Sequence, residues 1–136
     1  MTDSANVELV RSIMAGGERG ELLQPVPWAH PDIEWVIADG PTAGSWKGVA
    51  GMAESVRRML SAWDELRIYV DEYRALDDER VLVLLRRTGR GKTSGIDLGE
   101  LHTRGAAVYH VRDGKVTKIV SYYDRDRALA NLGLEA

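Results

Sequence analysis

Asp39 is the residue of this sequence best placed for acid–base chemistry. The hydrophobic residues before it recur at every second position, so we expect a strand on which Asp39 shares a face with Trp35 and Ile37. A carboxylate held among apolar groups has its charged form disfavoured, which makes it a stronger proton acceptor. Asp39 also precedes Gly40, and an Asp-Gly pair is typical of a turn. Catalytic base and turn residue are therefore both open interpretations.

Arg86 is the candidate for binding a carboxylate or polarising a carbonyl group. Strand alternation places it on the same face as Leu82 and Leu84, and this face is expected to point toward the interior. An arginine at the end of a strand can also extend its head group into solvent while its stem contacts the sheet. The sequence leaves both orientations of Arg86 open.

A binding pocket for a small molecule needs apolar walls and a few polar groups. The chain has four Trp, five Tyr and no Phe, so every aromatic ring carries a polar group that a ligand could satisfy. The predicted lining consists of Trp35, Ile37, Trp46, Val56, Leu82, Leu84, Arg86, Thr103, Ala107, Tyr109, Ser121 and Tyr123. The alternative is a filled core in which these side chains satisfy one another.

Metal and nucleotide sites are not expected. His30, His102 and His110 show no metal-ligand spacing, and the chain has no cysteine. The run 89–93, GRGKT, resembles the end of a phosphate-binding loop, but position 86 would have to be glycine and is Arg86. The run also leads toward a strand, whereas a phosphate loop must open a helix. We therefore predict no metal and no cofactor.

The elements that must position these residues follow from the hydrophobic periodicity. Apolar residues at three- and four-residue spacing predict helices, and period-two runs predict strands. The expected order is a first helix ending at Gly16, a short helix through Leu22 and Leu23, a strand from Asp32, a loop over 40–45, the longest helix over 49–63, strands over 66–76, 81–87, 100–111 and 115–123, and a short helix capped by Asp124. Consecutive strands joined by tight turns predict an antiparallel sheet, with the helices that precede it packed on one face, an α+β fold.

The turn between the last two strands decides which residues face inward. Asp113-Gly114 could form a two-residue loop, or Arg112-Asp113-Gly114 a three-residue loop. The two differ by one residue of register, which exchanges the faces of the partner strand. The three-residue loop places Tyr109, Ser121 and Tyr123 on one mostly apolar face and the charged residues on the other. We choose it because a half-buried sheet favours that separation.

The bulk composition fits one domain over residues 1–136. The formal net charge is −3 and the charges are interleaved, which argues against a nucleic-acid-binding protein. The N-terminal segment has neither the basic nor the apolar region of a signal peptide, and no apolar stretch is long enough to span a membrane. We expect a soluble, cytoplasmic protein with no membrane partner.

Several motifs carry a family resemblance. They are 106–116 (AAVYHVRDGKV), Tyr122-Tyr123-Asp124, Ala128-Leu129, 30–35 (HPDIEW) and Lys47-Gly48. With these motifs in this order, the sequence resembles the SnoaL-like, ketosteroid-isomerase-related families of the nuclear transport factor 2-like (NTF2-like) superfamily. The resemblance implies a cone-shaped fold in which a strongly bent antiparallel sheet wraps around the long helix, with two N-terminal helices. It also implies a homodimer through the outer sheet face.

The resemblance bears on catalysis residue by residue. Asp39 matches the place of the catalytic base of ketosteroid isomerases. The oxyanion-hole tyrosine would match near Val10 and the protonated aspartate would match Ala107, and neither side chain can donate a hydrogen bond. The last-strand acid of the epoxide-hydrolase relatives would match Ser121.

The sequence therefore predicts a domain that binds a small apolar or carbonyl-bearing molecule in a mostly apolar pocket, with no assigned reaction. The alternative is a cofactor-independent acid–base enzyme of the isomerase, cyclase or dehydratase type, with Asp39 as its base.

Overall fold

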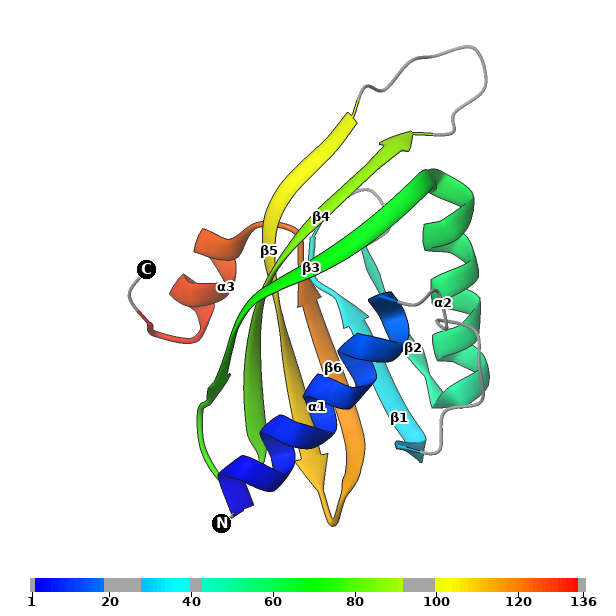
Figure 1. Ribbon diagram of the computed structural model, residues 1–136. Helices are drawn as coiled ribbons and strands as arrows, with labels where there is room; N and C mark the ends of the chain where they lie inside the picture. Colours follow the sequence, from blue (N-terminus) through cyan, green and yellow to red (C-terminus); the bar gives the residue numbers. More distant parts are fainter. Residues whose placement is uncertain (1, 19–27, 40–42, 92–99, 135–136) are drawn as a thin grey trace.

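The computed structural model describes residues 2–18, 28–39, 43–91 and 100–134. Its elements are α1 (Thr2–Glu18), β1 (Ala29–Ile37), β2 (Gly44–Lys47), α2 (Gly48–Ala62), β3 (Trp63–Ala75), β4 (Arg80–Gly91), β5 (Glu100–Arg112), β6 (Lys115–Tyr122) and α3 (Arg125–Asn131) (Figure 1). The predicted α+β class is confirmed. The predicted helix through Leu22 and Leu23 lies outside the described residues. Within the described part of the chain, no helix combines the length and apolarity needed to cross a membrane.

All six strands belong to one sheet with the order β2-β1-β6-β5-β4-β3. The strands from β3 to β6 pair antiparallel with their neighbours in sequence, as predicted. β1 pairs parallel with β6, so the prediction of a fully antiparallel sheet is wrong at this position. The reason is that β1 reaches β6 from a distant part of the chain, and no tight turn dictates its direction. β2 forms within and beyond the expected loop, because pairing with β1 stabilises a short segment with weak strand propensity.

The inner face of the sheet is the one that packs against α1 and α2. Val10 and Met14 of α1, together with Met52 of α2, join a core cluster with Ile33 and Tyr109 of the sheet. The apolar stripe predicted for the first helix is thus confirmed. With 17 residues, α1 is longer than α2, which has 15, so the expectation that the second of these is the longest helix is wrong.

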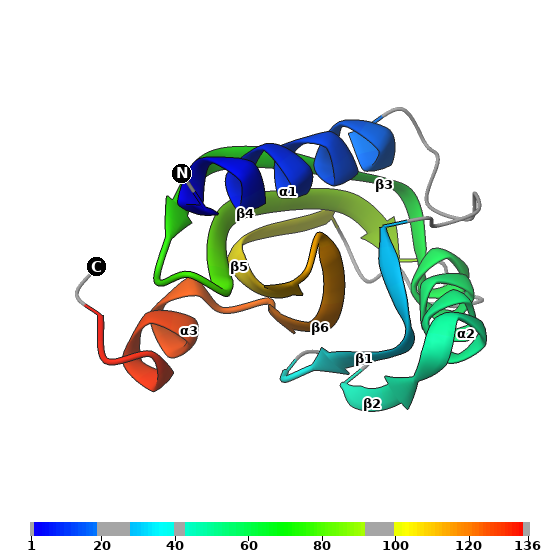
Figure 2. The ribbon, with the colours of Figure 1, turned by 90° about the horizontal axis from the view of Figure 1, so that it is seen from below.

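The outer face of the sheet packs against α3, which lies away from α1 and α2 (Figure 2). Ala128 and Leu129 of α3 form a second core cluster with Leu82, Leu84 and Val108 of the sheet. Asp124 is the N-cap residue of α3, as predicted, and its side chain accepts hydrogen bonds from the backbone N–H groups of the first helical turn. The sheet is therefore buried on both sides where β4 and β5 cross its centre.

The hairpin between β5 and β6 combines a tight turn with a bulge. Asp113 and Gly114 both have positive φ values, 52° and 75°, and form the two-residue turn, so the predicted three-residue loop is wrong. Beyond the turn the register shifts by one residue between His110 and Val111, and Thr117 is the extra residue of β6. This bulge restores the predicted pairing parity, so that Tyr109 lies opposite Ile119. The predicted inner-face grouping is confirmed although the loop prediction is not.

Candidate functional site

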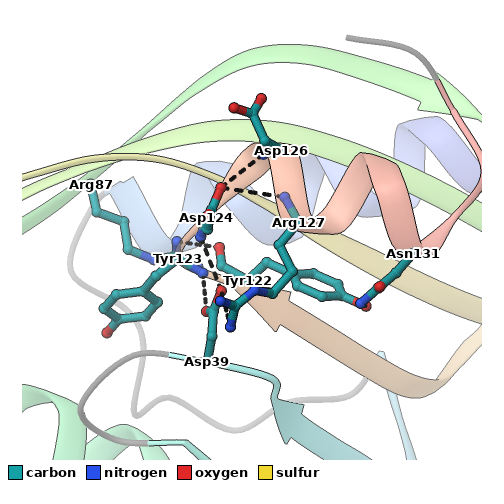
Figure 3. Close-up of polar contacts among 8 residues, drawn as sticks. All are labelled: Asp39, Arg87, Tyr122, Tyr123, Asp124, Asp126, Arg127 and Asn131. Carbon is teal, nitrogen blue, oxygen red and sulfur yellow. Dashed lines mark hydrogen bonds and ion pairs between the residues drawn. The ribbon is translucent and has the colours of Figure 1, made fainter.

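Arg87 is a charged residue buried on the inner side of the sheet. It is 4% exposed, and its guanidinium group reaches the end of β6. Nη1 donates to the backbone carbonyl of Tyr122 at 2.9 Å, and Nη2 donates to Oγ of Ser121 at 2.6 Å. The guanidinium carbon lies 4.6 Å from the ring centroid of Tyr123, a cation–π contact (Figure 3). These contacts hold the head group in one position.

Gly105 gives Arg87 its path across the sheet. Gly105 lies on β5, between β4 and β6, and pairs with Leu85. A Cβ atom at position 105 would collide with Nη1 of Arg87 and with the carbonyl oxygen of Tyr122. A glycine inside a strand often marks such a close approach. The side chain of Arg87 therefore reaches β6 only because position 105 has no side chain.

Four buried side-chain atoms have no hydrogen-bond partner among the described residues. They are Nε of Arg87, the hydroxyl oxygen of Tyr123, Nε1 of Trp35 and Oγ of Ser55. Buried polar atoms in native proteins are nearly always hydrogen-bonded, because an unsatisfied one costs about 1–3 kcal/mol. Each of these four groups carries a proton that it can donate. Within the described part of the chain, these four donors therefore lack the acceptors that buried polar groups ordinarily have.

The electrostatics around Arg87 are those of an incompletely compensated cation. Burial lowers the pKa of Arg87, and the nearby side chains of Tyr123, Tyr109 and Asp39 act in the opposite direction. An arginine keeps its proton in proteins even when buried. Among the described residues no carboxylate lies within 4.0 Å of the guanidinium nitrogens. The buried positive charge is therefore balanced by the dipoles of its two hydrogen-bond acceptors, by the ring of Tyr123 and by the carboxylate of Asp39, which forms no ion pair with it.

Asp39 lies just beyond β1 and is 8% exposed. Its Oδ1 accepts a hydrogen bond from the backbone N–H of Tyr123 at 2.5 Å, and its Oδ2 accepts one from that of Asp124 at 3.2 Å (Figure 3). Oδ2 also lies 3.8 Å from Nη1 of Arg127. The carboxylate thus ties the end of β1 to the junction between β6 and α3. This role was absent from the sequence-based interpretation.

Tyr109 connects β5 to α1 through the interior. Its hydroxyl group donates to Sδ of Met14 at 3.4 Å, a weak partner. Burial raises the pKa of Tyr109 to about 12, with smaller effects from Arg87 and Tyr73. Tyr109 therefore stays protonated at neutral pH and can act as a hydrogen-bond donor.

The structure brings together much of the predicted pocket lining. Ala107 pairs with Ser121 across β5 and β6, and both are buried on the inner side. Tyr123 follows under the guanidinium of Arg87. On β1, Ile37 is paired in register with Ser121.

The two predicted tryptophans lie next to each other. Trp35 pairs with Trp46 of β2, and Trp46 packs over Gly44 and Gly51. Trp35 contacts the inner core cluster. Together with the residues of β5 and β6, Trp35 lines the inner side that was predicted for binding.

Three predicted residues lie on the other side of the sheet. Leu82 and Leu84 belong to the outer cluster under α3. The Arg86 side chain is 54% exposed and its Nε donates to Oδ1 of Asp71 at 2.9 Å. The expectation that these three point inward is wrong, and Arg87 takes the inward position. Alternation could not decide the matter because the run 81–85 is apolar at every position, so both faces of β4 look equally buried.

Two further predicted residues cannot be placed in the same way. Val56 belongs to α2 and Thr103 to β5, where it pairs with Arg87 in register, but the side chains of both lie outside the described part of the structure. Ser55, by contrast, was not predicted. It is 1% exposed on α2, and a single serine within an apolar helical stripe offers no sequence signal.

Comparisons with known proteins agree with this architecture. A family model described as a SnoaL-like domain matches residues 18–119. An uncharacterized protein of Mycobacterium tuberculosis is 27% identical over 127 residues, which cover 90% of this chain and 92% of that protein. An NTF2-like protein of Burkholderia xenovorans LB400 is 30% identical, with a TM-score of 0.71 and 95% of each chain covered. TerC, whose crystal structure was determined with polyporic acid, has 23% sequence identity to this chain. The two structures match with a TM-score of 0.73 over 94% of this chain and 97% of TerC.

Proposed function

Because the chain belongs to the SnoaL-like domain family and has the NTF2-like fold, we propose that it is a single domain that binds a small molecule on the inner side of its sheet. The ligand is mostly apolar and carries a carbonyl or similar acceptor group. In this proposal the curved sheet, α1 and α2 enclose a cone, and the ligand lies against Arg87 and Tyr123. Binding, with no reaction assigned, is the function that the geometry supports best.

The observation that carries this proposal is the set of buried donors without partners. Arg87 Nε, Tyr123 Oη and Trp35 Nε1 are all buried donors, and Trp35 packs against the apolar inner cluster. Apolar walls with a few oriented donors are what a small carbonyl compound requires. The likeness to TerC, which was co-crystallized with polyporic acid, also supports a small-molecule site in this fold. It supports no particular ligand for this chain.

The test uses two neighbouring alanines of β5 that face opposite sides. Ala107 is 3% exposed in the inner cluster, and Ala106 is 0% exposed in the outer cluster. Binding of 2-acetylnaphthalene is measured by isothermal titration calorimetry for the wild type, Ala107→Leu and Ala106→Leu. We expect saturable binding with a negative heat-capacity change, lost in Ala107→Leu and retained in Ala106→Leu. Binding that is absent, or equally affected by both variants, contradicts the proposal.

The acid–base alternative depends on Asp39. Both of its oxygens already accept main-chain hydrogen bonds, from the N–H groups of Tyr123 and Asp124. These hydrogen bonds favour a structural role for Asp39 over a role as the base that abstracts a proton from a substrate. Turnover of a panel of cyclic ketones by the wild type, abolished in Asp39→Asn, would instead favour the enzyme.

We also propose a homodimer through the outer face where α3 does not cover it. Val36 of β1 and Val120 of β6 are in register and half-buried. The ion pair between Lys118 and Glu34, at 3.9 Å, flanks them. A small apolar patch beside complementary charges suits a two-fold interface. Sedimentation equilibrium should show a dimer that Val36→Lys dissociates, and a monomeric wild type would contradict this proposal.

A further inference from the structure

We infer that the ligand is an organic anion whose acidic group is held by Arg87. The chemical class is a small aromatic or alicyclic acid bound in its deprotonated form. This inference rests on the proposed function, because it names the chemistry of the molecule bound on the inner side of the sheet. The inference is based on the contacts of Arg87 and on the ion pairs that the carboxylates of Asp39 and Asp71 form with other arginines.

The first step concerns charge. Arg87 is 96% buried, since it is 4% exposed, and a buried charge is costly unless it is paired. Its hydrogen-bond acceptors are the carbonyl oxygen of Tyr122 and the hydroxyl of Ser121, both neutral groups. The Tyr123 ring adds a contact with its face but no formal charge. An anion next to the guanidinium would supply the missing negative charge.

The second step concerns the candidate counter-ions within the chain. Asp39 is the carboxylate that acts electrostatically on Arg87. Its two oxygens accept the N–H groups of Tyr123 and Asp124, and its ion-pair partner is Arg127 at 3.8 Å. Asp71 of β3 is exposed and pairs with Arg86 and Arg125 on the outer side. Neither carboxylate forms an ion pair with Arg87.

The third step concerns free donors. A guanidinium group has five N–H groups, and two of those of Arg87 are used by Tyr122 and Ser121. The Nε–H is buried without a partner, and so is the hydroxyl of Tyr123, whose ring lies against the same guanidinium. Planar guanidinium groups bind carboxylates through two parallel hydrogen bonds. The donors that remain therefore match an oxyanion better than they match a neutral ketone.

The fourth step concerns preorganisation. Gly105 lets the side chain cross β5, and the two hydrogen bonds to β6 fix the head group before any ligand arrives. A fixed donor loses little conformational entropy on binding, so a larger share of the interaction appears as affinity. Arg87 is thus positioned in the way expected of a ligand anchor.

The experiment compares a matched acid and amide. Binding of 2-naphthoate and of 2-naphthamide at pH 7 is measured by isothermal titration calorimetry for the wild type, Arg87→Met and Arg86→Met. Arg86→Met is the matched control, because the adjacent arginine is exposed on the other face. We expect the wild type and Arg86→Met to bind the acid at least about tenfold more tightly than the amide, as for a hydrogen-bonded charge. Arg87→Met should lose this preference and keep its affinity for the amide within about threefold of the wild type, because methionine replaces the apolar stem of the arginine and removes its charge and its donors.

A spectroscopic measurement covers the case in which Arg87→Met does not fold. In wild-type protein labelled with ¹⁵N-arginine, 2-naphthoate should shift one Nε–H resonance that is still present in Arg86→Met, and 2-naphthamide should leave it in place. Equal affinity for acid and amide, or a preference that persists in Arg87→Met, overturns the inference and leaves the proposed function standing. If the wild type binds neither compound, both the inference and the proposed function fail.

Discussion

Replacing Asp39 tests whether this buried carboxylate stabilises the fold. In Asp39→Ala, the buried N–H of Tyr123 loses an acceptor at 2.5 Å, which should cost about 1–3 kcal/mol. The bond from Asp124 N–H, at 3.2 Å, is partly buried, and the Arg127 side chain is 56% exposed, so each adds at most about 1 kcal/mol. The free energy of unfolding should therefore fall by about 2–4 kcal/mol.

Asp39→Asn separates the acceptor from the charge. The amide keeps one oxygen that can accept from Tyr123 N–H and loses the acceptor for Asp124, so we expect a loss of about 1–2 kcal/mol. Urea unfolding followed by circular dichroism measures both variants, with an unchanged m-value as the check on two-state behaviour. Asp32→Ala removes an exposed carboxylate of β1, the strand that precedes Asp39, and as the control it should lie within about 0.5 kcal/mol of the wild type.

One result would refute this reasoning. If Asp39→Ala is as stable as the wild type to within about 0.5 kcal/mol, then the carboxylate does not hold the junction of β6 and α3. Greater stability would argue further that the residue is kept for activity, because functional residues commonly cost stability. That outcome would favour the alternative in which Asp39 acts as a general base.

Two further predictions follow from buried contacts near the site. Gly105→Ala should destabilise the protein in urea by about 1–3 kcal/mol, because the added Cβ meets Arg87 and the Tyr122 carbonyl, and adding Arg87→Ala should recover part of that loss. Additivity of the two changes would contradict the assigned clash. For Tyr109, whose pKa is raised to about 12, the folded state holds its proton while the unfolded state releases it near pH 10. Stability should therefore fall between pH 10 and pH 12 by up to about 2–3 kcal/mol, and Tyr109→Phe should be free of this part of the decline.

Local patterns in the sequence determined most of the elements. The stripe of Val10 and Met14 gave α1 its buried face, and Asp124 marked the start of α3, because both depend on residues within one or two helical turns. The SnoaL-like resemblance followed from the same short motifs and is confirmed by the family match over residues 18–119. The alternation on β5 and β6 also identified the inner-face residues, since only one parity separates apolar from charged side chains.

Tertiary structure alone decided three matters. The choice between Arg86 and Arg87 depended on which apolar face of β4 meets α1 and which meets α3, and a strand buried on both sides carries no alternation to reveal it. The parallel pairing of β1 with β6 joins segments far apart in the chain, so no turn sequence encodes it.

The role of Asp39 is the third such matter. Its carboxylate oxygens accept from backbone N–H groups that lie 84 and 85 residues later in the chain. Nearly every residue type carries a backbone N–H, so the sequence does not indicate which of these groups will bind Asp39. Sequence patterns therefore identified part of the residues that could do chemistry, including Asp39 and Tyr109 but not Arg87, and the packing of distant segments determined which residues meet.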